Sequence, residues 1–265
     1  MAIGSPFSNQ SRSSSRYRCV NSKCLQISSH FPQVGAGIRV PPNSSRLGLA
    51  WGVDFDSIKK EVSRGNRFVD WRDNILLDIP FSNAESQYGA PYYFIHRADL
   101  IGALVKAANK HESITLRMDS KVVSYDFYSP ALQTADGQWH HADLIICANG
   151  IKSAARNTIN GTPIEPIDTG DVAYRILVPA NPLLDDPQTA HLVTQPWAVH
   201  WMGPEGHAVG YPLRGGELYN IIITSRTAQT SAHPLATTSG NPKRTTLSLF
   251  AASQTGVILS ESSAG

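Results

Sequence analysis

Residues 142–156 read ADLIICANGIKSAAR and decide the fold. The apolar run Leu144 to Ala148 has the length of a strand, and its composition predicts a strand buried on both faces. Asn149-Gly150 then interrupts the run with a turn signal, and Ser153 and Arg156 follow on a predicted helical turn. A strand that ends in a glycine turn lets the backbone approach a nucleotide, and the Ser and Arg behind it can reach phosphate oxygens. The stretch therefore predicts an α/β fold that contacts a nucleotide.

Four further stretches accompany this one in a fixed order. They are VGAGIRVPPN at 34–43, YFIHRADL at 93–100, DTGDVAYR at 168–175, and WMGPEGHAVGYPLRGGELYN at 201–220. Together the five stretches resemble the flavin-dependent aromatic hydroxylases, and most closely the salicylate-hydroxylase-like FAD monooxygenases of fungal type. The resemblance covers roughly residues 34–223. It implies a partial FAD-binding, Rossmann-like domain that is interrupted by an antiparallel β-sheet substrate domain.

The resemblance also implies residues that contact the cofactor. Gly35, Ala36 and Gly37 match the segment that such enzymes place close to the flavin, where backbone without bulky side chains can lie against the ring edge. Arg97 matches the arginine at a helix start that touches the flavin nucleotide. Asn149-Gly150 matches the second nucleotide-contacting motif, in which the pair is normally Asp-Gly. Because Asn carries no charge, its contact to an Arg or a ribose hydroxyl is weaker by ~1 kcal/mol or more.

Two residues match the side of these enzymes that faces flavin and substrate. Arg175 interrupts an apolar strand pattern, and a buried guanidinium requires a partner, so we expect it in the pocket. Tyr211 is expected to orient the substrate. The implied reaction uses NADH or NADPH to reduce FAD, and the reduced flavin then uses dioxygen to hydroxylate an aromatic or phenolic small molecule. The simpler reading of both tyrosines, Tyr174 and Tyr211, is that they pack at the edge of the core.

Two motifs of this family are missing from the sequence. The Gly-x-Gly-x-x-Gly turn that holds the FAD pyrophosphate occurs nowhere, and nothing after Ile223 resembles the later Gly-Asp motif at the flavin ribityl chain. Whether the chain is an enzyme is therefore open. One alternative is an inactive, truncated remnant that does not hold FAD. A further alternative is a nicotinamide-dependent dehydrogenase, which needs the same missing turn.

The composition excludes several classes of protein. Residues 1–53 contain six Lys or Arg and no acid, whereas residues 54–223 contain 14 bases and 20 acids, so the body is acidic although the net charge is +2. This argues against a nucleic-acid partner. Three cysteines form no metal-ligand pattern and are typical of a reducing compartment. No apolar run is long enough for a membrane span. We expect a cytoplasmic protein, with a mitochondrial location as the alternative for the acid-free N-terminal segment.

The chain is expected to have four regions. They are a Ser/Arg-rich and disordered segment at 1–33, the partial FAD-binding domain at 34–165, part of the substrate domain at 166–223, and a low-complexity, disordered tail at 224–265. Periodicity and turn signals predict helices at 43–52, 55–62 and 98–110. Asn43 is the expected N-cap of the first helix, with Leu47 on its apolar face, and Leu100, Leu104, Val105 and Ala108 share a face of the third. The same signals predict strands at 33–40, 67–79 (with a turn at 73–74), 91–95, 114–118, 121–128, 131–134, 138–141, 144–148, 172–178, 198–202, 208–213 and 217–223. Asp136-Gly137 and residues 214–216 are the expected turns between the strands that flank them.

Overall fold

The computed structural model describes residues 22–31, 35–204, 206–226 and 260–261. The chain forms two compact units. The first, the sheet unit, contains Val34–Ala50, Asp54–Leu100 and Asp168–Gly265. The second, the hairpin unit, contains Met1–Gln33, Trp51–Val53 and Ile101–Ile167. The mixture of helices with largely antiparallel sheets confirms the predicted α/β class.

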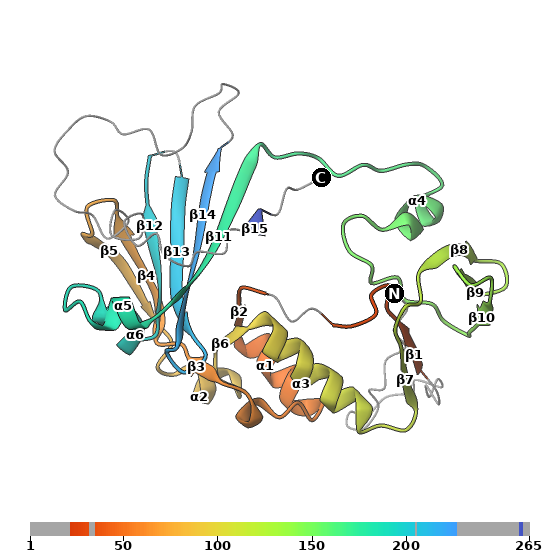
Figure 1. Ribbon diagram of the computed structural model, residues 1–265, viewed down its shortest axis with the longest axis horizontal. Helices are drawn as coiled ribbons and strands as arrows, with labels where there is room; N and C mark the ends of the chain where they lie inside the picture. Colours follow the sequence, from red (N-terminus) through yellow and green to blue (C-terminus); the bar gives the residue numbers. More distant parts are fainter. Residues whose placement is uncertain (1–21, 32–34, 205, 227–259, 262–265) are drawn as a thin grey trace. The chain divides into compact units, whose positions relative to one another are not determined.

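The sheet unit is built on a seven-stranded sheet of order β15-β11-β14-β13-β12-β4-β5 (Figure 1). Every neighbouring pair is antiparallel except β12 and β4, which are parallel. This confirms the antiparallel sheet predicted for the substrate domain, which also recruits β4 and β5 from earlier in the chain. The bounds are β4 Gly65–Asp70, β5 Ile75–Pro80, β11 Asp171–Pro179, β12 Trp197–Met202, β13 Gly206–Leu213, β14 Leu218–Arg226 and β15 Ser260–Glu261.

Turn chemistry connects the central strands as the sequence predicts. Between β13 and β14, Arg214, Gly215 and Gly216 all have positive φ, at 54°, 70° and 77°. Glycine adopts this left-handed region without steric cost, which explains the Gly-Gly pair. Between β4 and β5, the Asp70 carboxylate accepts hydrogen bonds from the backbone of Arg72 and Asn74. The predicted turn at 73–74 is therefore confirmed.

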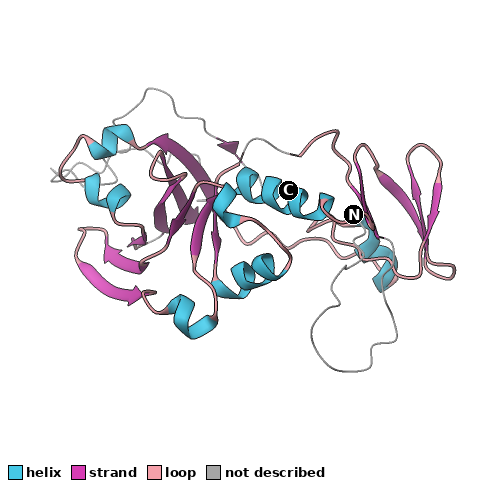
Figure 2. Cartoon of the chain, turned by 90° about the horizontal axis from the view of Figure 1, so that it is seen from below, coloured by secondary structure: helices cyan, strands magenta, loops and turns pink. Residues whose placement is uncertain are grey.

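The two faces of the large sheet are covered differently. One face, here called the helix face, packs against the short helices α5 (Asn181–Leu184) and α6 (Ala190–Thr194), which Figure 2 shows in cyan. The opposite face, here called the β6 face, packs against the small sheet β2-β6-β3, in which β6 is central. The bounds of these strands are β2 Gly37–Val40, β3 Lys60–Val62 and β6 Tyr93–His96. Phe94, Tyr211 and Leu213 form much of the core on the β6 face.

Helix α1 (Pro42–Ala50) differs from the prediction in how it begins and what it buries. It begins at Pro42, so Asn43 lies inside the first turn and is not the N-cap. Ser45 and Gly48 are its buried residues, whereas Leu47 is exposed. The reason is that the Ser45 hydroxyl donates a hydrogen bond of 2.6 Å to the Pro91 carbonyl, which turns that face of the helix inward.

Residues 55–62 do not form the predicted single helix. Phe55–Ser57 forms one 3₁₀ turn, capped by the Asp54 carboxylate, and the chain then becomes strand β3. Strand β3 pairs with β6, and this sheet pairing overrides the local helical preference. A short helix that was not predicted, α2 (Ala84–Tyr88), follows β5.

The longest helix is α3 (Arg97–Asn109), which confirms the helix predicted at 98–110. Its buried residues are Ala103 and Ala107. The predicted apolar face with Leu100, Leu104 and Val105 is therefore displaced, and Leu104 is exposed. Small residues at a four-residue spacing allow close approach, which explains why alanines and not leucines are buried.

The hairpin unit contains short strand pairings. Strands β8 (Val122–Asp126), β9 (Ala131–Thr134) and β10 (Trp139–His141) form a meander whose β9-β10 turn is the predicted Asp136-Gly137. Strand β1 (Ser22–Leu25) pairs in parallel with β7 (Ile114–Arg117). The prediction of disorder is wrong for residues 22–25. Residues 1–21 and residues 227–259 of the predicted tail lie outside the described residues.

The buried strand predicted at 144–148 does not form. Only Cys147 makes an isolated bridge, and Leu144 is 70% exposed. An apolar run becomes a strand only when neighbouring strands accept its backbone hydrogen bonds, and the described part of the hairpin unit gives this run no ladder. Across the described residues, no helix is both long and apolar enough to cross a membrane.

Candidate functional site

Polar side chains gather on the β6 face of the large sheet. Residues that pair across antiparallel strands lie on the same face, so the register identifies this set. Arg175 pairs with Ile222, Ile222 with Val209, and Val209 with His200. In the adjacent row, Asn220 pairs with Tyr211. The polar members of the β6 face include Asn66, Arg175, His200, His207, Tyr211 and Asn220.

Asn220 connects the large sheet to the segment predicted to lie beside a flavin. The Gly37 N–H donates a hydrogen bond of 2.9 Å to Asn220 Oδ1. The Asn220 side chain is fully buried, and its Nδ2 has no hydrogen-bond partner among the described residues. An amide within an apolar strand is costly unless it is paired, so this bond fixes the position of Gly37.

Tyr211 fills the space that a side chain at position 37 would need. A Cβ added to Gly37 would lie 2.6 Å from Tyr211 Cε2 and 2.7 Å from its hydroxyl. Tyr211 also packs on Phe94, with 4.8 Å between ring centroids. Burial raises the pKa of Tyr211 to about 12, opposed by the positive charges of Arg39 and Arg175. The ring is therefore held as a neutral phenol between the sheet and β2.

Arg39 is the cation that β2 brings to this face. Its Nη1 donates to Asn66 Oδ1 at 3.2 Å and lies 3.4 Å from His200 Nε2. His200 stacks on Phe68, with 4.5 Å between centroids. Burial, then Arg39 and then His207 lower the pKa of His200 to about 4, so the imidazole is neutral at pH 7. A neutral imidazole facing a guanidinium presents its unprotonated nitrogen, which places the proton on Nδ1.

Arg39, Asn66, His200 and Asn220 were not predicted from the sequence. Three of these residues carry a sequence signal that could have identified them. Arg39 lies in GIRV, His200 in WAVHWM and Asn220 in LYNIII, each a polar residue within an apolar strand pattern. The same observation singled out Arg175, and it applies equally to these positions.

Gly35, Ala36 and Arg97 lie together at the start of α3. The Arg97 N–H donates to the Ala36 carbonyl at 3.0 Å, and a Cβ at Gly35 would lie 3.3 Å from Arg97 Cβ. The Arg97 side chain is exposed. The structure therefore brings Gly35, Ala36 and Arg97 together, as the sequence predicts for a shared site.

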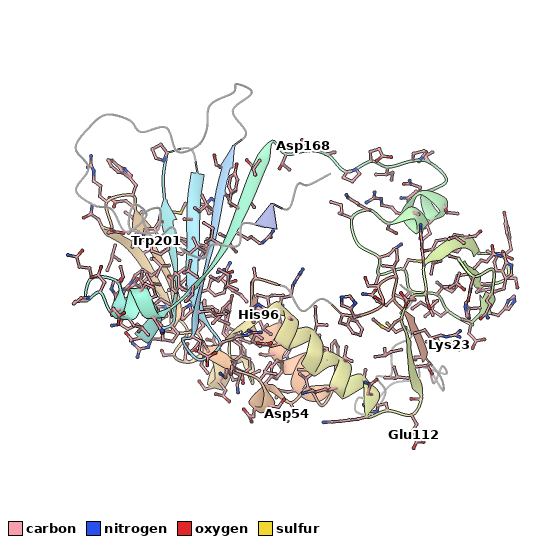
Figure 3. The ribbon with its side chains drawn as sticks, viewed as in Figure 1. Lys23, Asp54, His96, Glu112, Asp168 and Trp201 are labelled. Carbon is pink, nitrogen blue, oxygen red and sulfur yellow. The ribbon has the colours of Figure 1, made fainter. Side chains whose placement is uncertain are left out.

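His96 marks the junction of β6 and α3 in Figure 3. It is buried, and Arg214 Nη2 lies 3.4 Å from its Nδ1. Arg214 also forms a two-pronged pair with Asp99, at 2.9 and 2.8 Å. Burial, and then the charge of Arg214, lower the pKa of His96. These contacts tie the turn between β13 and β14 to the first turn of α3.

Arg175 has a different setting from the one predicted. It lies on β11 with the β6-face residues, and its charge acts on Tyr211, but its side chain is exposed. Arg175 therefore acts on Tyr211 through its positive charge. Arg39 contacts Asn66 and His200 on this face.

Asn149 and Gly150 belong to the hairpin unit, whereas the other predicted site residues belong to the sheet unit. Gly150 has φ 80°, and Asn149 Oδ1 accepts a 2.6 Å hydrogen bond from the Ser153 hydroxyl. Ser153 caps the seven-residue helix α4 (Ala154–Asn160). Arg156 Nη2 donates to the Ile164 carbonyl at 2.7 Å. The turn predicted at Asn149-Gly150 forms, with its polar groups engaged by the protein's own chain.

The described residues do not form a complete cradle for FAD. The spaces beside Gly35 and Gly37 are filled by Arg97 and Tyr211, and the Gly37 N–H is already bonded to Asn220. The Gly-x-Gly-x-x-Gly turn that would receive a pyrophosphate is absent from the sequence. What the sheet unit does present is a substrate-side surface with a phenol, a neutral imidazole and a guanidinium.

A cavity of about 320 Å³ lies on the helix face, lined among others by Trp197, Trp201, Arg67 and His191. The Trp201 Nε1–H donates to the Asp73 carboxylate at 2.9 Å within it. This cavity contains none of the predicted site residues. Within the described ranges, no group of three or more His, Cys, Asp or Glu is placed to hold a metal ion.

Comparison with known proteins shows the relatives of the chain. Over 210 residues it is 33% identical to "FAD-dependent monooxygenase phomE'" of Diaporthe leptostromiformis, covering 76% of this chain and 53% of that protein. Over 212 residues it is 28% identical to "3-hydroxybenzoate 6-hydroxylase 1" of Aquipseudomonas alcaligenes, covering 76% of this chain and 50% of that protein. The chain thus spans about half the length of the relatives it matches. No family model matches it.

The fold also matches solved structures. The crystal structure of CtdE in complex with FAD and substrate 4 superposes with a TM-score of 0.64 at 19% identity, over 80% of this chain and 52% of that one. At this identity the match shows the fold alone. It confirms the architecture predicted from the five sequence stretches.

Proposed function

The chain belongs to the FAD-dependent monooxygenases of the aromatic-hydroxylase type, and from this premise we propose that it supplies the substrate-binding sheet for hydroxylation of an aromatic or phenolic small molecule. The activity proposed for the whole protein uses FAD, NADH or NADPH, and dioxygen. FAD, when bound, supplies the redox chemistry. The remaining contributions, which are binding, orientation and exclusion of water, come from the residues of the β6 face.

One observation carries this proposal. The β6 face places Tyr211, His200 and Asn220 on adjacent central strands directly against β2, whose first residue is Gly37. Such a face combines apolar area with a few fixed polar groups, which is typical of small-molecule sites. Phe94 and Phe68 supply aromatic surface beside these groups.

The predicted site residues have distinct proposed roles. Tyr211, buried with its pKa raised to about 12, is proposed to orient a substrate hydroxyl as a neutral hydrogen-bonding phenol. Arg175 adds positive charge near Tyr211 from β11 and is proposed to favour an anionic or phenolate substrate. Gly35, Ala36 and Arg97 are proposed to approach the flavin from the start of α3, and Asn149-Gly150 to contact its nucleotide.

A second candidate function rests on a specific observation. The strand predicted at 144–148 does not form, and the sequence contains no pyrophosphate turn. These two facts favour a chain that keeps the substrate sheet but does not hold FAD. No observation in the described residues favours the nicotinamide-dependent dehydrogenase considered above.

Titration of the purified chain with FAD separates the two candidates. Saturable quenching of flavin fluorescence in the micromolar range, followed by NADPH or NADH oxidation stimulated by 3-hydroxybenzoate, is the result expected of a working monooxygenase. A folded chain with no flavin quenching would instead establish the second candidate. Far-ultraviolet circular dichroism of the same sample serves as the control for folding.

A further inference from the structure

Arg39 has the features of a guanidinium that lacks a counter-ion. Across residues 22–31, 35–204 and 206–226, the ion pairs involve Lys59, Lys60, Arg67 and Arg214. Arg39 takes part in none of them, although its side chain is half-buried. A partly buried charge without an opposite charge is costly, because burial removes water that would otherwise solvate it.

Neutral groups hold Arg39 in place. Its Nη1 donates to Asn66 Oδ1 at 3.2 Å and approaches His200 Nε2 at 3.4 Å. Both contacts use the same nitrogen. Nε and Nη2 make no hydrogen bond within the described chain, and neither is among the buried unpaired atoms, so both reach the surface of this part of the protein. A guanidinium offers five donors in a fork that fits a carboxylate, and most of that fork is free here.

The electrostatic surroundings favour an anion at this place. The central row of the β6 face contains Arg175 and His200, and the register places His207, Asp70 and Asp171 toward the strand ends. On the covering sheet, Glu61 lies on the same face as Arg39 but across β6, where burial raises its pKa and its carboxyl accepts hydrogen bonds from the backbone of Gly216 and Gly215. The charge of Arg39 also favours the ionised forms of Tyr92 and Tyr211. The same charge disfavours protonation of His200. The imidazole therefore stays neutral and needs no anionic partner of its own.

From this geometry we propose that Arg39, positioned by Asn66 and His200, is the anion-binding residue of the β6 face and selects ligands that carry a carboxylate or phenolate. That the ligand is aromatic rests on the proposed function; the preference for an anion rests on the unpaired guanidinium alone. Arg175, which the sequence predicts to attract the anion, is exposed and adds positive charge near Tyr211.

The test compares two probes that differ in charge and little in shape, 3-hydroxybenzoate and 3-hydroxybenzamide. Binding to the full chain is measured by calorimetry without FAD. The benzoate is expected to bind about ten-fold or more tightly than the benzamide, as a charged hydrogen bond implies. Arg39→Gln should remove this preference, and Arg39→Lys should keep part of it, since lysine retains charge without the fork.

Two matched variants make the result decisive. Arg46→Gln changes an exposed arginine on α1 and should leave the preference intact, whereas Arg175→Gln should weaken it only in part, because Arg175 contributes nearby positive charge. A preference that survives Arg39→Gln, or that only Arg175→Gln abolishes, overturns the proposal. Equal affinity for both probes, or no binding of either, also overturns it. Failure of FAD to bind is a separate result, because the probes are measured without flavin.

A second measurement does not depend on ligand binding. The ring protons of His200 report its protonation in an NMR titration of the free chain. Arg39→Gln should raise the pKa of His200 from about 4 toward its ordinary value, because a nearby positive charge is removed. Arg46→Gln should not change it. An unchanged His200 titration in Arg39→Gln would show that the Arg39–His200 contact is not formed in solution.

Discussion

The sheet unit and the hairpin unit contain similar apolar residues but bury them very differently. In the sheet unit, Ile221 is 2% exposed, and Phe94, Leu213 and Tyr219 are completely buried. In the hairpin unit, Ile151 is 68% exposed and Ile167 is 90% exposed. The difference lies in the packing partners. The first group packs within a seven-stranded sheet that is covered on both faces, whereas the second group belongs to a unit with only short strand pairings.

The two units show which elements predicted from sequence need hydrogen-bond partners from distant parts of the chain. Hairpins, caps and the helix α3 form in either setting, because their hydrogen bonds are made within a few residues. A buried strand such as the one predicted at 144–148 takes all its hydrogen bonds from other strands and does not form without them.

The largest expected effect tests the burial contrast directly. Ile221→Ala should destabilise the sheet unit by about 2–5 kcal/mol, because it opens a cavity in a closely packed core. Ile151→Ala in the hairpin unit should change stability by less than about 0.5 kcal/mol. Urea unfolding followed by tryptophan fluorescence measures both. Equal costs for the two variants would mean that Ile151 is buried in solution and would remove the contrast.

The next effect concerns close packing of glycine against tyrosine. Gly37→Ala should cost about 1–3 kcal/mol, because the new Cβ would lie 2.6 Å from the Tyr211 ring, whose surroundings are rigid. Gly102→Ala, in α3, has no atom within 4 Å of its new Cβ and should stabilise by up to about 1 kcal/mol. Thermal unfolding of the two variants gives the comparison. Full tolerance of Gly37→Ala would show that β2 is displaced from Tyr211.

A smaller effect depends on pH and on His200. Its pKa in the folded chain is about 4, against 6.5 as the ordinary value, so protons bind the unfolded state more readily. The stability that neutral His200 contributes to the folded chain is fully present above pH 6.5 and is lost as the pH falls toward 4. Allowing for screening at a partly exposed group, the loss is about 1–2 kcal/mol.

His200→Asn should reduce this decline between pH 6.5 and 4, measured as urea unfolding free energies at several pH values. The matched control is His191→Asn, an exposed histidine on α6, which should leave the pH dependence as in the parent chain. If His200→Asn declines as steeply as the parent, the imidazole is not held neutral by its surroundings.

The smallest expected effect is in the hairpin unit. Asn149→Asp restores the usual Asp-Gly pair at an exposed turn, and Ser153 can still donate to the new carboxylate. Stability should change by less than about 0.5 kcal/mol. A larger loss in urea unfolding would show that Asn149 supports the unit. FAD titration of the same variant shows whether the carboxylate improves nucleotide contact.

Much of the fold could be predicted from local patterns. Strands β4, β5 and β11 to β14 of the large sheet, the Asp136-Gly137 hairpin, the turn at 214–216 and α3 were predicted near their observed bounds, whereas β15 lies in the tail that was predicted to be disordered. Pairing between distant parts of the chain could not be predicted from local patterns. Nothing local to residues 22–25 indicates that they pair with 114–117, and nothing in 55–62 shows that part of it will join β6.

The site was predictable to the extent that it lies in recognisable stretches. Gly35, Ala36, Arg97 and Tyr211 were singled out from such stretches, and the structure places the first three together and Tyr211 against Gly37. Their assignment to flavin and substrate stays a prediction. The links among Arg39, Asn66 and His200 join β2, β4 and β12, and only the three-dimensional pairing reveals that these positions meet.

The parallel pairing of β4 with β12 also constrains how the chain reaches its fold. Gly65 pairs with Trp197, so β4 must wait for a strand that is synthesised much later, after the whole of residues 101–167. During that interval the β4-β5 hairpin exposes Phe68 and Val69, whose partners on β12 do not yet exist. Such late closure slows folding and favours aggregation of partly made chains. Expression at low temperature or with chaperones should therefore raise the yield of folded protein.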